Sequence, residues 1–501
     1  PVTESPRRDE ARQRVVDTET ALHSRGEAPV MQEPQPTVEK EEAVGDLKPV
    51  GAGATAATSA PILKPKLATN SATLAAPPVP PYEAANRENY ADHDDNPVQR
   101  TIETPVSTFS IDVDAGSYAN VRHMLVQGRV PPADAVRAEE FINYFDYNYT
   151  PPRSVDPPFS VTVEAGPAPW NAQRQLLLIG LQGYRVDSAE IPAANLVFLI
   201  DTSGSMQSPD KIDLLKSSFK AMVSRLRAQD RVSIVVYAGS AGLVLPPTPG
   251  SEHARIIAAL DQLQAGGSTN GGAGIELAYA TAKQAFVGGG VNRVLLATDG
   301  DFNVGTTDME ALKTLIADKR KSGIALTTLG FGEGNYNDAL AEQLADVGNG
   351  NHYYIDTPAE GRKVLIDSLS ATLLTIAKDV KIQIEFNPAR VAEYRLIGYE
   401  NRLLRREDFN NDQVDAGEIG AGHNVTALYE LVLKDGATQI DPLRYAGVPA
   451  PTLKGDELAF LRLRYKPAGG DTSKLIERPI VLRELSTPPS KAVRMIHCRT
   501  D

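Results

Sequence analysis

The central part of the chain alternates short apolar runs with segments of helical periodicity. Residues 196–200 read Leu-Val-Phe-Leu-Ile, and residues 294–297 read Val-Leu-Leu-Ala. Continuous apolar runs are typical of strands covered on both faces, as in a parallel sheet between two layers of helices. The segment after the first run carries apolar residues at helical spacing, namely Ile212, Leu215, Phe219, Met222, Val223 and Leu226. Repeated strand and helix units predict an α/β domain with a doubly wound, mostly parallel sheet over residues 193–377.

The flanks of this domain have a different pattern, in which apolar and polar residues alternate. Such alternation is typical of antiparallel sheets with one face in water. The predicted strands are residues 159–165 and 175–185 before the domain, and residues 380–386, 395–399, 425–433 and 458–465 after it. Strands on opposite sides of a compact domain pair only if that domain is an insertion between them. The pattern therefore predicts a discontinuous antiparallel β-sandwich made of residues 155–190 and 378–487.

A smaller segment, residues 100–150, precedes the sandwich. Residues 106–114 alternate like a strand. Residues 115–128 and 133–147 have helical patterns, and the second begins after two prolines. The segment is therefore predicted to contribute one strand and two helices.

Both ends of the chain have compositions that disfavour a packed core. The first 81 residues contain twelve prolines and no Phe, Tyr or Trp, so the apolar surface they can bury does not offset the entropy of ordering them. Residues 1–95 are therefore predicted to be a disordered arm or tether. Residues 488–501 begin with a Pro-Pro pair, and we expect them to be unstructured.

Oxygen-bearing side chains gather where the two apolar runs end. Asp201, Ser203 and Ser205 follow the first run, and Asp299 follows the second within Thr-Asp-Gly. A glycine-rich loop between them adds the hydroxyl of Thr269. Open α/β sheets bind ligands at the carboxyl ends of their strands, and hard oxygen atoms in that position suit a small divalent cation. The alternative for the first turn is that Asp201 and Ser203 only cap the helix that follows.

These three pieces, in this order, resemble the metal-ion-dependent adhesion site (MIDAS) of the von Willebrand factor type A family. The resemblance implies that the five side chains hold Mg²⁺, or Mn²⁺ or Ca²⁺ in its place. It also implies that the ion binds an Asp or Glu carboxylate of a protein ligand. A third interpretation stays open, in which the ion only braces the fold.

Other stretches resemble a bacterial group within that family, the YfbK-like proteins. They are Thr108–Arg122 (Thr-Phe-Ser-Ile-Asp-Val-Asp-Ala-Gly-Ser-Tyr-Ala-Asn-Val-Arg), Ile142–Tyr147 (Ile-Asn-Tyr-Phe-Asp-Tyr) and Glu400–Leu404 (Glu-Asn-Arg-Leu-Leu). The resemblance covers residues 100–487, whereas residues 490–501 resemble none of the longer family sequences. The resemblance therefore implies that residues 488–501 are the end of a truncated chain.

A second acidic stretch, residues 408–418, starts like an EF-hand calcium loop. Its candidate Ca²⁺ ligands are Asp408, Asn410, Asp412, the Val414 carbonyl, and Asp415 or Glu418. Gln413 and Ile419 stand where such a loop has its glycine and its bidentate glutamate. Two interpretations therefore stay open, a calcium site and a polar hairpin loop.

Composition narrows the functional classes. The formal net charge of −13 disfavours a nucleic-acid partner, since phosphate backbones select for clustered Lys and Arg. One cysteine, Cys498, excludes an intrachain disulfide.

The sequence has no apolar stretch of about 18 residues, the length that predicts a transmembrane helix. Ser203 lies outside any Gly-x-Ser-x-Gly elbow, and the glycine-rich loop lacks Gly-Lys-Ser/Thr, so we do not expect an enzyme.

We expect a metal-dependent protein-binding protein, an adhesion molecule or scaffold. The alternative function is a chaperone-like assembly factor for an intracellular complex. The family resemblance and the arm favour the periplasmic side of the cell envelope over the cytoplasm. The chain starts at Pro1 rather than Met, so we expect an export signal or lipid anchor upstream.

Overall fold

The computed structural model describes residues 87–484, apart from residues 112, 188, 301–308, 442 and 444–454. The predicted arm, except for residues 87–95, and the predicted end lie outside this range. No helix among the described residues is long and apolar enough to cross a membrane.

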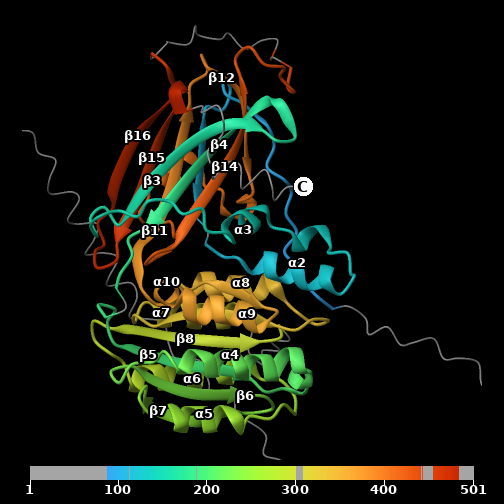
Figure 1. Ribbon diagram of the computed structural model, residues 1–501, viewed down its shortest axis with the longest axis vertical. Helices are drawn as coiled ribbons and strands as arrows, with labels where there is room; N and C mark the ends of the chain where they lie inside the picture. Colours follow the sequence, from blue (N-terminus) through green and yellow to red (C-terminus); the bar gives the residue numbers. More distant parts are fainter. Residues whose placement is uncertain are drawn as a thin grey trace, which may run out of the picture. The chain divides into compact units, whose positions relative to one another are not determined.

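Five parallel strands and one antiparallel strand form the central sheet, counting only described residues. The parallel strands, in order across the sheet, are β10 (His352–Ile355), β9 (Ala325–Phe331), β8 (Val291–Thr298), β5 (Ala194–Asp201) and β6 (Arg231–Tyr237) (Figure 1). The edge strand β7 (Ala241–Pro249) runs antiparallel to β6. Sequence reasoning missed β7 because its prolines argue against a strand, although an edge strand tolerates proline.

Helices cover both faces of this sheet. Along β5, Phe198 and Ile200 face one layer, whereas Val197 and Leu199 face the other. The first layer contains α4 (Leu214–Val223), α5 (His253–Asp261) and η5 (Lys363–Asp367), and the second contains α6 (Gly271–Gln284), α7 (Met309–Arg320) and α8 (Asp338–Val347). The rings of Phe198 and Phe219 stack at 4.2 Å across the first interface. The predicted doubly wound sheet is confirmed.

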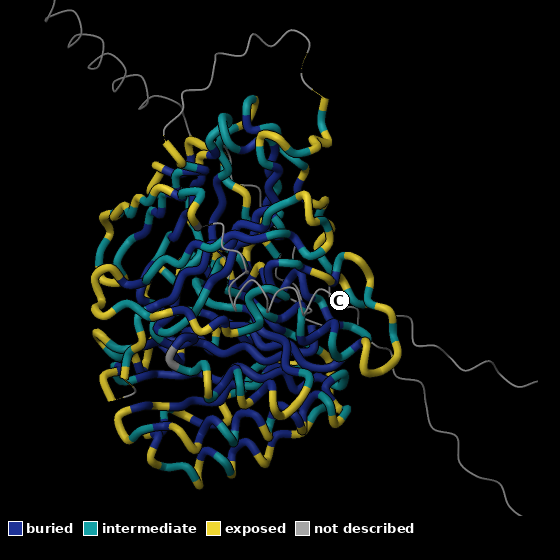
Figure 2. The backbone as a smooth tube through the Cα atoms, turned by 45° about the horizontal axis from the view of Figure 1, so that its top comes forward, coloured by how far each residue is buried: buried dark blue, intermediate teal, exposed yellow. Residues whose placement is uncertain are grey.

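Two antiparallel sheets form the sandwich. One contains β1 (Gln99–Arg100), β12 (Val391–Ile397), β14 (Asn424–Leu433), β4 (Asn171–Gly183) and β3 (Phe159–Ala168), in this order. The other contains β13 (Ile419–Gly420), β11 (Thr375–Phe386), β15 (Glu457–Pro467) and β16 (Lys474–Val481), with β2 (Val106–Ser110) also paired to β11. Their inner faces share one apolar core, and Figure 2 shows buried backbone running through the interior of the molecule with exposed backbone at its rim.

Strands from both sides of the α/β domain pair with one another in this sandwich. Leu181 of β4 lies opposite Val425 of β14, and Phe109 of β2 lies opposite Ile382 of β11. Pairing across the domain confirms that the α/β domain is inserted in a discontinuous β-sandwich. It also shows that the strand predicted at residues 106–114 belongs to a sandwich sheet.

One predicted helix and one predicted domain boundary differ from those observed. The helix expected over residues 133–147 is split into η2 (Ala133–Ala135) and α3 (Ala138–Asn143). Arg137 between them is extended, with φ −99° and ψ 111°, because its side chain is buried in an ion-pair network. The α/β domain, expected to end at residue 377, has α10 (Leu369–Leu373) as its last helix, and β11 of the sandwich begins at Thr375.

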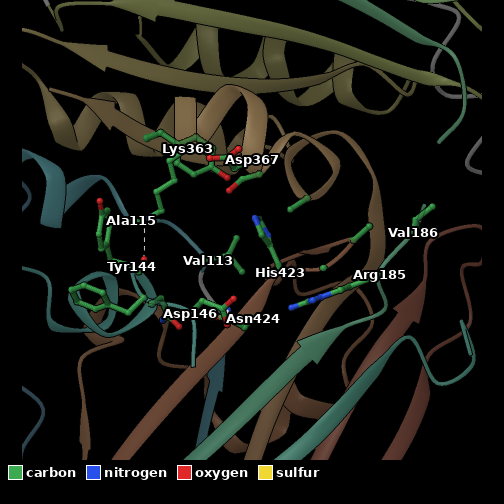
Figure 3. Close-up of a pocket in the computed structure, with 17 residues that line it drawn as sticks. Val113, Ala115, Tyr144, Asp146, Arg185, Val186, Lys363, Asp367, His423 and Asn424 are labelled. Carbon is green, nitrogen blue, oxygen red and sulfur yellow. Dashed lines mark hydrogen bonds between the residues drawn. The ribbon is translucent and has the colours of Figure 1, made fainter. Parts of the chain in front are cut away.

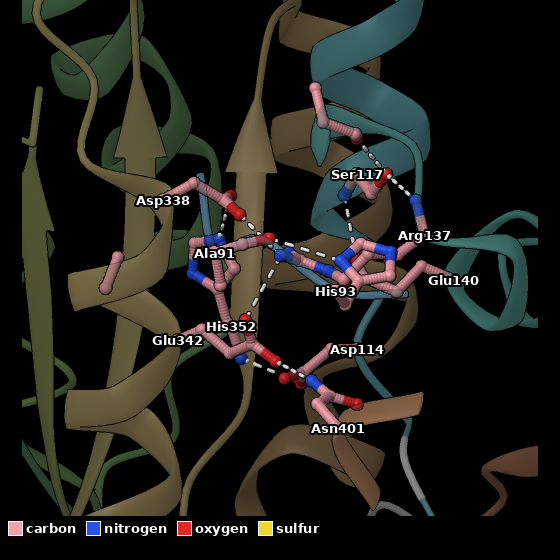
Figure 4. Close-up of polar contacts among 12 residues, drawn as sticks. Ala91, His93, Asp114, Ser117, Arg137, Glu140, Asp338, Glu342, His352 and Asn401 are labelled. Carbon is pink, nitrogen blue, oxygen red and sulfur yellow. Dashed lines mark hydrogen bonds and ion pairs between the residues drawn. The ribbon is translucent and has the colours of Figure 1, made fainter. Parts of the chain in front are cut away.

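The buried ion-pair network centres on Arg137, which precedes α3. Its guanidinium lies 2.7 Å from Asp338 and 3.1 Å from Glu342, both on α8, and pairs with Glu140 (Figure 4). Burial would raise the pKa of Asp338, but Arg137 and His352 outweigh it and hold that pKa below its usual range. The network therefore binds the α3 segment to the inserted domain through ionised groups.

Further contacts extend this network. The backbone N–H of His352 on β10 donates to Asp114 Oδ1 at 2.9 Å, and Asp114 precedes α2 (Gly116–Val126). On the sandwich side, the Asn401 amide donates to Glu342 at 2.8 Å. All three regions of the chain therefore meet at one buried polar cluster.

Replacing Arg137 by Met is expected to lower the free energy of unfolding by about 3–5 kcal/mol, because Asp338 and Glu140 would stay buried without their cation. Arg320→Met is the matched control, since the Asp415 side chain in its ion pair is 55% exposed. We expect that control to cost about 1 kcal/mol or less. Urea unfolding of the full chain measures both losses, and equal losses would contradict a special role for Arg137.

Candidate metal centre

The candidate site lies at the carboxyl edge of the central sheet. Neighbouring parallel strands β5 and β8 end at the same level, since Ile200 lies opposite Ala297. Asp201 and Asp299 follow these two positions, and neither residue is exposed to solvent. Two carboxylates are therefore buried side by side where the sheet opens.

The turn after β5 holds Asp201 and presents two hydroxyl groups. The Ser203 N–H donates to Asp201 Oδ1 at 2.8 Å, and the Thr298 hydroxyl lies 3.3 Å from Asp201 Oδ2. The hydroxyl oxygens of Ser203 and Ser205 are 2.9 Å apart. This turn continues into a short helix, Gly204–Gln207. No side chain caps that helix, so simple capping does not account for Asp201 and Ser203.

The glycine-rich loop is hydrogen-bonded to this turn. The Gly266 N–H donates to the Thr202 carbonyl at 2.8 Å, and the Gly204 N–H donates to the Gly267 carbonyl at 3.0 Å. Gly267 has φ +91°, a conformation that favours glycine. The half-buried Thr269 lies two residues further along the same loop. The structure therefore places Thr269 on a loop attached to the Asp201 turn.

Sequence reasoning missed Lys211, which is 6% exposed. Its ammonium lies 3.0 Å from Asp299 Oδ2 and 2.9 Å from the Asn335 side-chain oxygen. A side chain at Gly332 would collide with the aliphatic part of Lys211, and Gly332 also has φ +68°. Helical spacing in the sequence could have indicated that Lys211 is buried, because it lies four residues before Leu215 and so on the same face of the helical segment.

The electrostatics of the site favour a further cation. Burial raises the pKa of Asp201 to about 6; the Ser203 N–H opposes this rise, and the neighbouring Asp299 adds to it. In the described part of the chain, Lys211 is ion-paired with Asp299 and no cation is ion-paired with Asp201, so the two carboxylates outnumber the ammonium when both are ionised. Two carboxylates and the hydroxyls of Ser203 and Ser205, with Thr269 on the adjoining loop, would offer an all-oxygen donor set, which suits Mg²⁺. The residues present therefore fit the predicted ion.

The second predicted metal loop is arranged differently. Its acidic side chains contact cations of the chain: Asp408 contacts Arg405, Asp412 contacts Arg464, and Asp415 contacts Arg320. The Lys381 ammonium donates to the carbonyls of Asp408 and Asn411, at 3.2 and 2.6 Å.

Glu418 is turned to other partners, the Asn349 amide and the Thr375 hydroxyl. Asn410 is exposed and Val414 is partly buried. In the described part of the chain, no three acidic, histidine or cysteine side chains come together as a metal cluster. These contacts favour a polar loop over the calcium loop for residues 408–418.

Three family models match the chain in succession. They are von Willebrand factor at residues 84–178, von Willebrand factor type A domain at residues 195–365, and Uncharacterized protein YfbK, C-terminal, at residues 371–496. Uncharacterized protein YfbK of Escherichia coli (strain K12) is 52% identical over 399 residues, which are 78% of this chain and 69% of that relative. The chain belongs to the YfbK family of von Willebrand factor A proteins. The last family model extends to residue 496, so the expectation that the family resemblance ends at residue 487 was wrong.

More distant relatives match smaller parts of this YfbK-family chain. Uncharacterized protein sll0103 of Synechocystis sp. is 29% identical over 166 residues, 33% of this chain and 38% of its own. The magnesium-chelatase 60 kDa subunit of Rhodobacter capsulatus is 31% identical over 147 residues, 28% of this chain and 26% of its own. A solved von Willebrand factor type A structure from Catenulispora acidiphila is 17% identical, covers 67% of this chain and 74% of its own, and has a TM-score of 0.39.

Replacing Lys211 by Met is expected to tighten Mg²⁺ or Mn²⁺ binding by about tenfold or more, because Asp299 would no longer be shared with an ammonium. The same change should destabilise the metal-free protein by about 3–5 kcal/mol, since it leaves a buried carboxylate without its cation. Titration calorimetry and urea unfolding measure the two effects.

The control for this experiment is Lys220→Met on helix α4, which removes an exposed ion pair with Asp261. It should change neither quantity appreciably. An unchanged metal affinity in Lys211→Met would show that the ammonium does not compete with the ion.

Proposed function

We propose that this protein binds another protein through a divalent cation held by Asp201 and Asp299. The observation that carries the proposal is the charge balance at the open edge of the sheet. Among the described residues, Asp201 and Asp299 are both fully buried and only Asp299 has an ion-paired ammonium, that of Lys211. A von Willebrand factor A domain is typical of proteins that bind other proteins or act as scaffolds, and the family match supports that general role.

The residues of the chain have separate roles in this proposal. Asp201 and Asp299 supply negative charge, while the hydroxyls of Ser203, Ser205 and Thr269 complete the oxygen donors. The bound ion would supply an electrophilic position for an Asp or Glu of the partner. In the described part of the chain, no histidine is hydrogen-bonded to Ser203 or Ser205, which favours binding over nucleophilic catalysis.

A chaperone-like assembly factor for an intracellular complex is the alternative function. The match to a magnesium-chelatase subunit gives it some support, because that relative is by name part of a larger enzyme. Both functions would use the same metal centre. The identity and compartment of the partner distinguish them.

We also propose that the protein works on the periplasmic side of the cell envelope, held there by the proline-rich arm. The composition of the first 81 residues supports a tether. Fractionation of cells that express the whole gene tests this proposal, and recovery in the cytoplasm would favour the assembly factor.

Replacing Asp201 or Asp299 by Ala is expected to abolish both Mg²⁺ binding and capture of the partner. Ser203→Ala and Thr269→Ala should weaken both by roughly tenfold, since each removes one neutral oxygen ligand. Chelation should mimic the Asp variants, and added Mg²⁺ or Mn²⁺ should restore only the unmutated protein. Calorimetry with Mg²⁺ and quantitative crosslinking in cells are the two measurements.

Asp213→Ala is the matched control, because Asp213 is an exposed carboxylate near the same site. It should leave metal binding and capture intact. Partner capture that persists in metal-free Asp201→Ala protein would reject the proposed function. If chelation lowers only the unfolding temperature, the ion is a structural brace.

A further inference from the structure

A second candidate site lies away from the metal centre, in a cavity of about 480 Å³. Its walls come from all three regions of the chain: the end of α3, the segment after β4, helices η5 and α10, and the turn before β14 (Figure 3). None of the five candidate metal ligands lines it. Its volume lies in the range of about 300–1,000 Å³ that small-molecule sites occupy.

Two cations line this cavity without a carboxylate partner. The Lys363 ammonium donates to the Tyr144 carbonyl at 2.9 Å and lies 3.0 Å from the centre of the Tyr144 ring. Arg185, on the opposite wall, is exposed. Among the residues that the structure describes, neither cation has a carboxylate oxygen within 4.0 Å. Neither cation is therefore ion-paired within 4.0 Å by a described residue, although Glu360 lies near enough to Lys363 to act on its pKa.

The acidic side chains of the cavity already have partners. Asp146 Oδ1 accepts hydrogen bonds from the Asn148 N–H at 2.7 Å and the Asn424 amide at 3.3 Å. Asp367 is 3.9 Å from Arg362, which lies outside the lining. The cations therefore have more unused binding capacity than the carboxylates.

His423 stands between the two cationic walls (Figure 3). Its backbone is fixed, since its carbonyl accepts the Gly183 N–H at 2.7 Å and its N–H donates to Gly420 at 3.1 Å. Its ring Nδ1 is inaccessible to solvent and has no hydrogen-bond partner among the described residues. Burial, assisted by Arg293, lowers the pKa of His423 to about 4. The ring is therefore neutral at pH 7. Because Nδ1 is shielded, the hydrogen bond to a ligand in the cavity would come from the Nε2–H tautomer.

The partial burial of Lys363 also favours a negatively charged ligand in this cavity. Burial lowers the pKa of its ammonium to about 8; Glu360 opposes this shift, and Arg122 adds to it. An ammonium taken partly out of water gains more from a nearby anion than an exposed one does. Apolar walls, including Val113, Val186 and Ala371, favour an organic ligand over a bare inorganic ion.

We propose that this cavity binds a small organic anion, whose charged group lies between Lys363 and Arg185 and accepts a hydrogen bond from His423. A carboxylate and a phosphate monoester share this chemistry. Lys363 belongs to the inserted domain, whereas Arg185 and His423 belong to the sandwich. A bound anion would therefore join the two parts of the molecule.

The test uses full-length Asp201→Ala protein treated with chelator, so that no anion binds through the metal centre. Glutarate and glycerol phosphate are titrated separately by calorimetry at low ionic strength. We expect at least one of them to bind with a Kd of about 1 mM or tighter. Which probe binds more tightly distinguishes the carboxylate from the phosphate source.

Lys363→Met and Arg185→Met should each weaken that binding by about tenfold or more, because each removes a charged hydrogen-bond donor. Lys363→Arg retains the charge and should retain most of the affinity. It also shows that any loss in Lys363→Met is not a folding defect. Lys321→Met, at a 72%-exposed side chain, is the matched surface control and should have no effect.

The proposal is overturned if neither probe binds at about 20 mM, or if binding is the same in both Met variants as in the parent. Because the assay is run without metal, either result leaves the proposed metal-dependent function untouched.

Discussion

The closure of the sandwich across an inserted domain constrains the rest of this structure. The chain leaves β4 at Gly183 and returns at β11, and these points are in van der Waals contact, since an added Cβ at Gly183 would lie 3.0 Å from Ile376. Gly183 also donates to the His423 carbonyl. The von Willebrand A domain must therefore begin and end at one place on the sandwich. That requirement brings α8 and η5 against the α3 segment and explains why buried polar groups concentrate there.

Ion pairs, in addition to apolar packing, hold the inserted domain against the α3 segment at this junction. Arg137 neutralises Asp338 and Glu140, although burial still raises the pKa of the nearby Glu342 to about 7. A buried ion pair adds little net stability over an apolar contact, but losing one partner is costly. The junction therefore has a specific geometry and is sensitive to substitution. Both properties suit an inserted domain that must keep one position relative to the sandwich.

Sequence periodicity predicted the main layers because each strand carries its own pattern. The run at residues 196–200 is apolar throughout since β5 is covered on both faces, and it ends at Asp201 as expected. The pattern failed where long-range contacts decide the backbone. Arg137 is extended because of its ion pairs with α8, and Lys211 is buried because of Asp299 on another strand. Neither partner is near in sequence, so local spacing carried only part of the signal.

Charge balance, rather than acidity, separates the two stretches that sequence reasoning proposed as metal sites. In residues 408–418, Asp408 and Asp412 face arginines, and Lys381 contacts the loop carbonyls. A calcium ion would have to displace these cations and would leave them without counter-charges. At the carboxyl edge of the sheet, Lys211 pairs with Asp299, and no cation among the described residues pairs with the buried Asp201. A divalent ion there would add positive charge beside both carboxylates. The same donor chemistry therefore supports a metal in one place and disfavours it in the other.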